Sequence, residues 1–124
     1  MDSAIKATGR IPDAVLSGHV HSYQRFERKL GKQTVPYIVA GAGGYANTSK
    51  LMHKIEKTAQ GKSLPKNFQT TLADVKLAHF NDVEPGFLRV SVNNGTRKLL
   101  IEYFLVPFAG APSGAAFDSV EVDF

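Results

Sequence analysis

Gly18-His19-Val20-His21 is the segment of this chain whose residue types and spacing could do chemistry. It follows an apolar run that predicts a buried strand over residues 14–17. Open α/β proteins build their sites at the carboxyl ends of strands, and imidazole is the commonest metal ligand among side chains. The pattern therefore indicates a metal site at the point where a strand ends.

The spacing of the two histidines bears on how many metal ions they could bind. Residues two apart point to the same side of a regular strand, but at a strand end the backbone turns and can aim them at separate points. That arrangement suits two metal ions about 3.5–4 Å apart, each bound by one imidazole. The alternative is a pair of partly exposed loop histidines that bind nothing, and the spacing alone does not separate the two.

Composition limits the class of protein and the kind of metal site. A chain of 124 residues is one domain or part of one, and its 43% hydrophobic content suits a packed core. Cysteine is absent, which excludes disulfides and thiolate sites. Any metal would therefore have nitrogen and oxygen ligands, which suit Fe, Zn or Mn. No apolar stretch approaches the roughly 18 residues of a membrane span, so no membrane partner is expected.

The charge is unevenly distributed along the chain. Residues 24–66 carry a balance of +7 and residues 67–124 one of −3. A basic block beside a metal site could attract anions such as phosphates, although a solvated surface explains the same charges. Nucleic-acid binding is not expected, because the basic residues are not interleaved with aromatic ones.

The elements that must position the histidines are predicted from pattern and turn chemistry. Gly9 ends a helix over residues 2–9, residues 19–25 form a loop after the first strand, and residues 37–40 form a central strand. Capping residues at 47–49 predict a helix over about residues 50–60. Residues 62–82 have no clear pattern.

The second half of the chain predicts mainly antiparallel strands. Residues 87–92 and 98–106 are strands joined by a turn containing Asn94-Gly95, a strong hairpin signal. Residues 107–116 form a loop, and residues 119–124 a final edge strand. The expected fold class is α+β, with a mixed, largely antiparallel sheet and one or two helices.

A longer string around the histidines resembles a known family: Val15-Leu16-Ser17-Gly18-His19-Val20-His21-Ser22-Tyr23-Gln24-Arg25-Phe26. It is similar to the last motif block of calcineurin-like metallophosphoesterases, most of all the purple acid phosphatase branch. Residues 36–44 are similar to the strand and glycine turn that follow in that family, and residues 87–92 to its closing hairpin. The resemblance covers about residues 10–45 and 86–106.

The resemblance implies a fold, a site and an activity. His19 and His21 would bind different ions of a pair of divalent or trivalent metals (Fe, Zn or Mn), and Tyr23 and Arg25 are candidates for a substrate pocket. The fold would be part of an α/β/β/α sandwich, and the reaction hydrolysis of a phosphoester substrate. No catalytic acid or base is assigned.

One departure from the family is large. Its upstream ligand blocks (Asp-x-His, Gly-Asp, Gly-Asn-His and a further histidine) have no counterpart before Gly18. We therefore expect residues 1–124 to be a single C-terminal part of such an enzyme, which alone binds metal weakly and is inactive. We also expect this part to self-associate as a homo-oligomer, because a sheet face would lose its cover.

Two other functions remain open at this stage. Gly41-x-Gly43-x-x-Ala46 after a strand matches a dinucleotide-binding pattern, but no acidic residue follows at the expected distance. The chain could instead be a non-catalytic domain that serves packing or partner binding. His53 and His79 are minor candidates for additional metal ligands.

Overall fold

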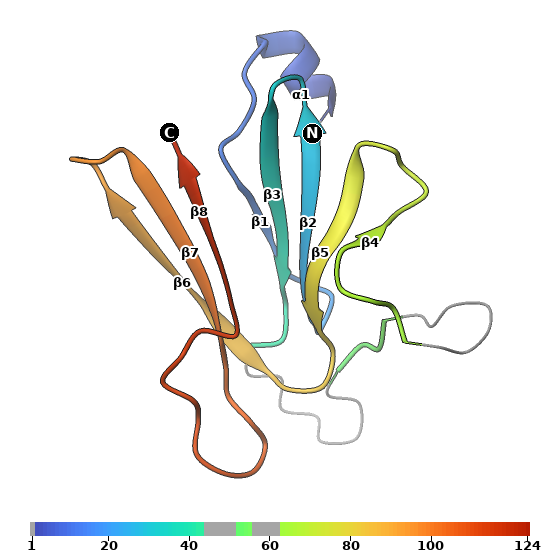
Figure 1. Cartoon of the computed structure of the whole chain (residues 1–124), viewed down its shortest axis with the longest axis vertical. Helices are drawn as coiled ribbons and strands as arrows, with labels where there is room; N and C mark the ends of the chain where they lie inside the picture. The colour runs from blue at the N-terminus through green and yellow to red at the C-terminus, as the bar shows by residue number, and fades with distance from the viewer. Residues whose placement is uncertain (1, 44–51, 56–62) are drawn as a thin grey trace.

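The structure, a computed structural model, describes residues 2–43, 52–55 and 63–124 and is drawn in Figure 1. Its elements in chain order are α1 (Asp2–Thr8), β1 (Val15–Ser17), β2 (Tyr23–Leu30), β3 (Gln33–Ala40), β4 (Phe68–Gln69), β5 (Val75–Asn81), β6 (Gly86–Asn93), β7 (Lys98–Leu105) and β8 (Asp118–Asp123). The strands form two sheets, where the sequence predicted a single mixed sheet, and strands together with a short helix fit the predicted α+β class.

The first sheet is mixed and has five strands in the order β1-β3-β2-β5-β4. β1 runs parallel to β3, and the other neighbours are antiparallel. β2 and β3 form a hairpin whose turn contains Gly31, with a φ of 63° that favours glycine. β3 has a strand on each side, so the prediction of a central strand is confirmed.

The second sheet has three antiparallel strands in the order β6-β7-β8. The hairpin predicted from Asn94-Gly95 is confirmed, with β6 and β7 paired in register from Gly86 opposite Leu105 to Asn93 opposite Lys98. Residues 94–97 connect the strands, and the Asn93 side chain accepts a hydrogen bond from the Thr96 amide at 3.0 Å. β8 is the predicted final edge strand.

Three features of the first sheet differ from what the sequence indicates. The strand expected to be buried, β1, leaves Leu16 48% exposed because β1 lies at the edge of the sheet. The predicted loop over residues 19–25 ends earlier, because β2 begins at Tyr23 and pairs with a strand on each side. Residues 62–82, unassigned from sequence, contain β4 and β5. A bulge explains the weak signal of β5: His79 lies opposite Arg25 and Leu77 opposite Phe26, so Ala78 interrupts the alternation.

The helix predicted over residues 50–60 lies mostly outside the described residues, and its described part, residues 52–55, is not helical. The backbone amides of this stretch bond to distant segments instead of forming helical turns. The His53 amide donates to the carbonyl of His21, and the Ile55 amide donates to the carboxylate of Asp82. Tertiary contacts therefore override the capping signal of the sequence.

The hydrophobic core lies between the two sheets, which Figure 1 shows approaching each other at one end and diverging at the other. Tyr23 and Ile38 from the first sheet pack with Ile101 and Tyr103 from the second. The rings of Tyr23 and Tyr103 stack with centroids 4.0 Å apart. Stacked aromatic rings add to the free energy gained from burying their surface, so this pair contributes to holding the two sheets together.

A buried carboxylate joins the same two sheets through polar contacts. Asp118 on β8 accepts hydrogen bonds from the Tyr23 hydroxyl at 2.7 Å and from Arg25 at 2.7 and 3.0 Å. The Nδ1 atom of His79 lies 3.1 Å from the same carboxylate. Because the three partners belong to β2 and β5, Asp118 connects the second sheet to the first; we name these four residues the Asp118 cluster.

The electrostatics of the Asp118 cluster favour the ionised carboxylate. Burial raises the pKa of Asp118, but hydrogen bonds from Arg25 and Tyr23 outweigh that effect and hold the pKa below its ordinary value of 3.8. Burial and the hydrogen bond to Asp118 together raise the pKa of Tyr23. Tyr23 therefore remains a neutral hydrogen-bond donor to an anionic acceptor, which is a strong pairing.

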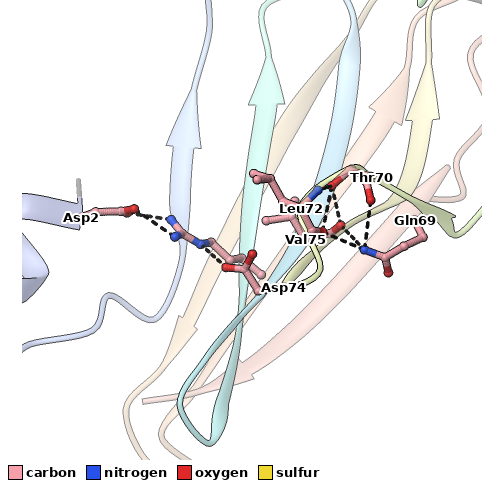
Figure 2. A network of polar contacts seen from close by, with 7 residues as sticks. Asp2, Gln69, Thr70, Leu72, Asp74 and Val75 are labelled. Atoms are coloured by element: carbon pink, nitrogen blue, oxygen red, sulfur yellow. Dashed lines mark hydrogen bonds and ion pairs between the residues drawn. The ribbon is translucent and has the colours of Figure 1, made fainter.

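A second set of ion pairs attaches α1 to β2, the middle strand of the first sheet. Arg28 on β2 bonds to both carboxylate oxygens of Asp2 at 2.7 and 3.0 Å, and its Nε atom bonds to Asp74 at 3.0 Å. Figure 2 labels Asp2 and Asp74, the two acidic residues that bond to this guanidinium. These groups are more exposed than those of the Asp118 cluster, so we expect them to orient α1 more than they stabilise the fold.

Replacing Asp118 by Asn tests whether the cluster joins the sheets. Asp118→Asn removes the buried negative charge that faces Arg25, which should lower the free energy of unfolding by roughly 3 kcal/mol. Glu121→Gln on the same strand removes an exposed partner of Lys98 and serves as the control. Urea denaturation should separate the two variants; equal stabilities would contradict the role of Asp118.

The stability of the chain should depend on the ionisation of Asp118. The folded pKa lies below the unfolded value of about 3.8, so the carboxylate stabilises the fold above that pH. Its contribution falls as the pH drops through 3.8 towards the folded pKa. The difference in unfolding free energy between the wild type and Asp118→Asn should therefore shrink below about pH 4. A difference that is constant from pH 7 to pH 3 would argue against this assignment.

Candidate metal site at the end of β1

The two candidate ligands lie in the loop of residues 18–22 that joins β1 to β2, which we call the histidine loop. β1 and β3 run parallel, with Ser17 paired with Val39. The carboxyl ends of both strands therefore lie at the same end of the sheet (Figure 1). The histidine loop leaves one of these ends, and residues 41–43, which we call the glycine turn, leave the other. This is the place in the sheet where the sequence predicts a site.

The histidine loop packs directly on the backbone of the glycine turn. A Cβ atom on Gly41 would lie 2.3 Å from the Val20 carbonyl oxygen and 3.0 Å from the His19 amide nitrogen. No side chain larger than that of glycine fits there, because both neighbours are backbone atoms. Gly41 is thus required for the position of the histidine loop.

His19 adopts a backbone conformation that is uncommon for a side chain other than glycine. Its φ is 73°, in the left-handed region, and the residue is exposed. Histidine tolerates this region better than most residues, yet the conformation costs free energy and clusters at functional sites. Asn67 and Arg97 also have positive φ values, of 59° and 53°, so the conformation of His19 is not by itself a sign of function.

His21 is half-buried and makes close contact with His53, which comes from a distant part of the chain. The His21 amide donates to Nδ1 of His53 at 3.0 Å, and the His53 amide donates to the His21 carbonyl at 2.9 Å. The two imidazole rings stack with centroids 4.6 Å apart and an interplanar angle of 6°. The sequence placed His53 on a helix and did not indicate this pairing.

The metal-ligand set falls short of a complete site. Among residues 2–43, 52–55 and 63–124, no three His, Cys, Asp or Glu side chains are grouped so that they could hold a metal ion. A catalytic ion of the zinc type needs about three protein ligands. The described residues therefore do not by themselves fit a metal pair, and we derive no chemical step through one. His19 and His21 stay predicted ligands.

Tyr23 and Arg25, the candidates for a substrate pocket, both direct their polar atoms to Asp118. Tyr23 is 2% exposed, and Arg25 also bonds to Glu27 at 2.7 Å. These contacts secure the first residues of β2, immediately after the histidine loop. Contact of Tyr23 and Arg25 with substrate stays a prediction, whereas their structural contact with Asp118 is observed.

His79, the other minor ligand candidate, lies between the sheets. Its ring stacks on Phe117 with centroids 4.7 Å apart, and its Nδ1 atom faces Asp118. The structure thus assigns His79 to the Asp118 cluster. Sequence reasoning missed Asp118 because an acidic residue at the start of an alternating edge strand carries no signal of its distant partners.

The glycine turn is explained by packing. Gly41 contacts the histidine loop, and the carbonyl of the next residue, Ala42, accepts a hydrogen bond from the Gly86 amide at 3.4 Å, linking the glycine turn to the start of β6. The space beside Gly41 is therefore filled by backbone, where a dinucleotide site would need room for a pyrophosphate. Ala46, the last position of that pattern, lies outside the described residues.

Comparison with known proteins found no match to a family model, to a curated protein or to a solved structure. In the described part of the chain, no helix is long and apolar enough to cross a membrane. Any assignment of function therefore depends on the sequence blocks and on the geometry of the histidine loop.

Substituting Gly41 by Ala tests the packing of the histidine loop. The added Cβ must displace the Val20 carbonyl, so Gly41→Ala should lower the free energy of unfolding by roughly 2 kcal/mol and shift the amide resonances of His19 and His21. The matched control is Gly114→Ala, where the added Cβ meets no atom within 4 Å. If both variants have the stability and the NMR spectrum of the wild type, the Val20 carbonyl does not pack against Gly41 as described.

Proposed function

We propose that this chain is the C-terminal portion of a dinuclear-metal phosphoesterase, in which His19 and His21 each bind one of two metal ions. The observation that carries the proposal is the position of the histidine loop. It leaves the carboxyl end of β1 beside the parallel strand β3 and packs on the glycine turn. The motif block around His19 and His21 resembles calcineurin-like metallophosphoesterases, and two sheets enclosing a core agree with a sandwich of that type.

The number of available ligands defines what the proposal requires. Two imidazoles supply one ligand per ion, so the other ligands must come from an upstream part of a longer protein. In such an enzyme His19 and His21 would each supply one imidazole ligand, and the bound ions would supply Lewis-acid chemistry at a phosphoryl group. The residues of this chain would hold the ions in place: His19 from a strained turn, and His21 from a position fixed by neighbouring segments.

The alternative is a non-catalytic domain that serves packing or partner binding. One observation favours it: three of the candidate functional residues contact the Asp118 carboxylate. Tyr23 and Arg25 donate hydrogen bonds to it, and Nδ1 of His79 lies 3.1 Å from it. A nucleotide-binding module has less support, because backbone atoms of the histidine loop fill the space beside Gly41.

Zinc titration of the labelled chain distinguishes these functions. We expect Zn²⁺ to shift the ring resonances of His19 and His21 with weak affinity, because one imidazole per ion binds poorly without further ligands. The resonances of His79 in the Asp118 cluster should stay in place and serve as an internal control. A chain in which Zn²⁺ shifts none of these rings, or only His79, would favour the non-catalytic domain.

Hydrolysis provides the second test of the proposed function. The isolated chain should not hydrolyse p-nitrophenyl phosphate, whereas the longer protein should, and His19→Ala or His21→Ala should lower its kcat at least 100-fold. The paired control is Lys98→Ala, which alters an exposed residue on β7. Full activity of both histidine variants would rule out their proposed role.

We also propose that the isolated chain self-associates through β6, an edge strand of the second sheet. Phe87, Val90 and Val92 on this edge strand are 52%, 44% and 59% exposed. Long apolar edge strands pair readily with other chains. Light scattering should detect an oligomer that Val92→Lys converts to a monomer, and a wild-type monomer at high concentration would refute the proposal.

A further inference from the structure

We propose that His53 is a positioning residue for His21: it holds the backbone and the ring of His21 in the place from which His21 would act. The contact between the two residues is independent of any function. Its consequence for metal binding rests on the proposed function above.

The contact has three parts that act on the same residue. The amide of His21 donates to a ring nitrogen of His53, and the amide of His53 donates back to the carbonyl of His21. The stacked rings, 6° from parallel, add a constraint on the ring plane. Together they restrain both the backbone and the side chain of His21, which a single hydrogen bond would not do.

The hydrogen bond also determines the role that His53 can play. Nδ1 of His53 accepts the proton of an amide, so its lone pair is occupied and the proton of the neutral ring resides on Nε2. Neither ring nitrogen then offers a lone pair to a metal ion. His53 thus supports His21 and is not itself a metal ligand. The sequence had made His53 a minor candidate for an additional ligand.

Asp82, at the end of β5, holds the residues that follow His53. The Ile55 amide donates to the Asp82 side chain at 2.9 Å, and the Lys54 ammonium donates to the Asp82 carbonyl. Asn81, the preceding residue, pairs with Tyr23, the first residue of β2 after the histidine loop. The segment of residues 53–55 therefore bridges the histidine loop and the neighbouring strand, which keeps His53 in place.

A residue that orients a metal ligand typically changes metal affinity 10- to 100-fold when it is mutated. His53→Ala removes the acceptor and the stacked ring. We therefore expect the apparent Kd for Zn²⁺, read from the ring resonances of His21, to rise 10- to 100-fold. His53→Asn keeps a side-chain acceptor but loses the ring, and its Zn²⁺ response should lie between those of the wild type and His53→Ala.

The contact itself can be measured without metal. In the ¹⁵N-labelled wild type, a scalar coupling across the N–H···N bond should connect the His21 amide to Nδ1 of His53. His19→Ala should retain this coupling, and His53→Ala should abolish it while keeping a dispersed spectrum. If the folded wild type lacks the coupling, the inference is overturned.

The two proposals fail in different ways. A coupling in the wild type with no Zn²⁺ response would show that His53 holds His21 and that the metal function is wrong. A coupling together with an equal Zn²⁺ response of His21 in the wild type and His53→Ala would show that the contact does not position a ligand. A coupling with a weakened response in His53→Ala supports both.

Discussion

The structure depends on one buried carboxylate, Asp118, which has its partners in the opposite sheet. In the part of the chain that the structure describes, strand pairing joins strands within each sheet and none across the two, so side chains largely determine how the sheets face each other. Apolar packing is nearly non-directional, whereas a carboxylate bonded by a guanidinium and a phenol fixes both distance and orientation. The stacked pair of Tyr23 and Tyr103 lies in the same region and adds apolar surface to this directional contact.

This contact has a consequence for the histidine loop, because the residues that contact Asp118 begin where the loop ends. Tyr23 is the first residue of β2, and Arg25 is two residues further on. On its other side, the loop is limited by the backbone contact with Gly41. The short segment between these supports has little freedom, which is consistent with the strained backbone of His19. A loop held in this way can present side chains in fixed positions.

The sequence predicted those parts of the fold that have a local signal. The end of α1 just before Gly9, the hairpin of β6 and β7, the internal position of β3 and the edge strand β8 follow from turn chemistry and apolar pattern. β5 was not predicted, because the extra residue Ala78 breaks its alternation. The non-helical path of residues 52–55 was missed because its amides bond to segments that are distant in the sequence.

The candidate site shows the same division between local and distant information. The sequence identifies His19 and His21 because their spacing and the preceding strand are local features, and it places both at the strand end where the structure has them. It does not identify Asp118 or the pairing of His53 with His21, since each depends on residues more than 30 positions apart. An acid at a strand start and a histidine in a basic stretch become informative only when the fold brings their partners together.

The most direct test of the central claim is a double-mutant cycle between the two sheets. Tyr23→Phe removes the donor and Asp118→Ala removes the acceptor of the same hydrogen bond, and urea denaturation gives the free energy of unfolding of each variant and of the double variant. The account predicts a coupling of about 1.5 kcal/mol or more, because the bond involves a charged acceptor in a buried place. Additive effects, within about 0.5 kcal/mol, would contradict it.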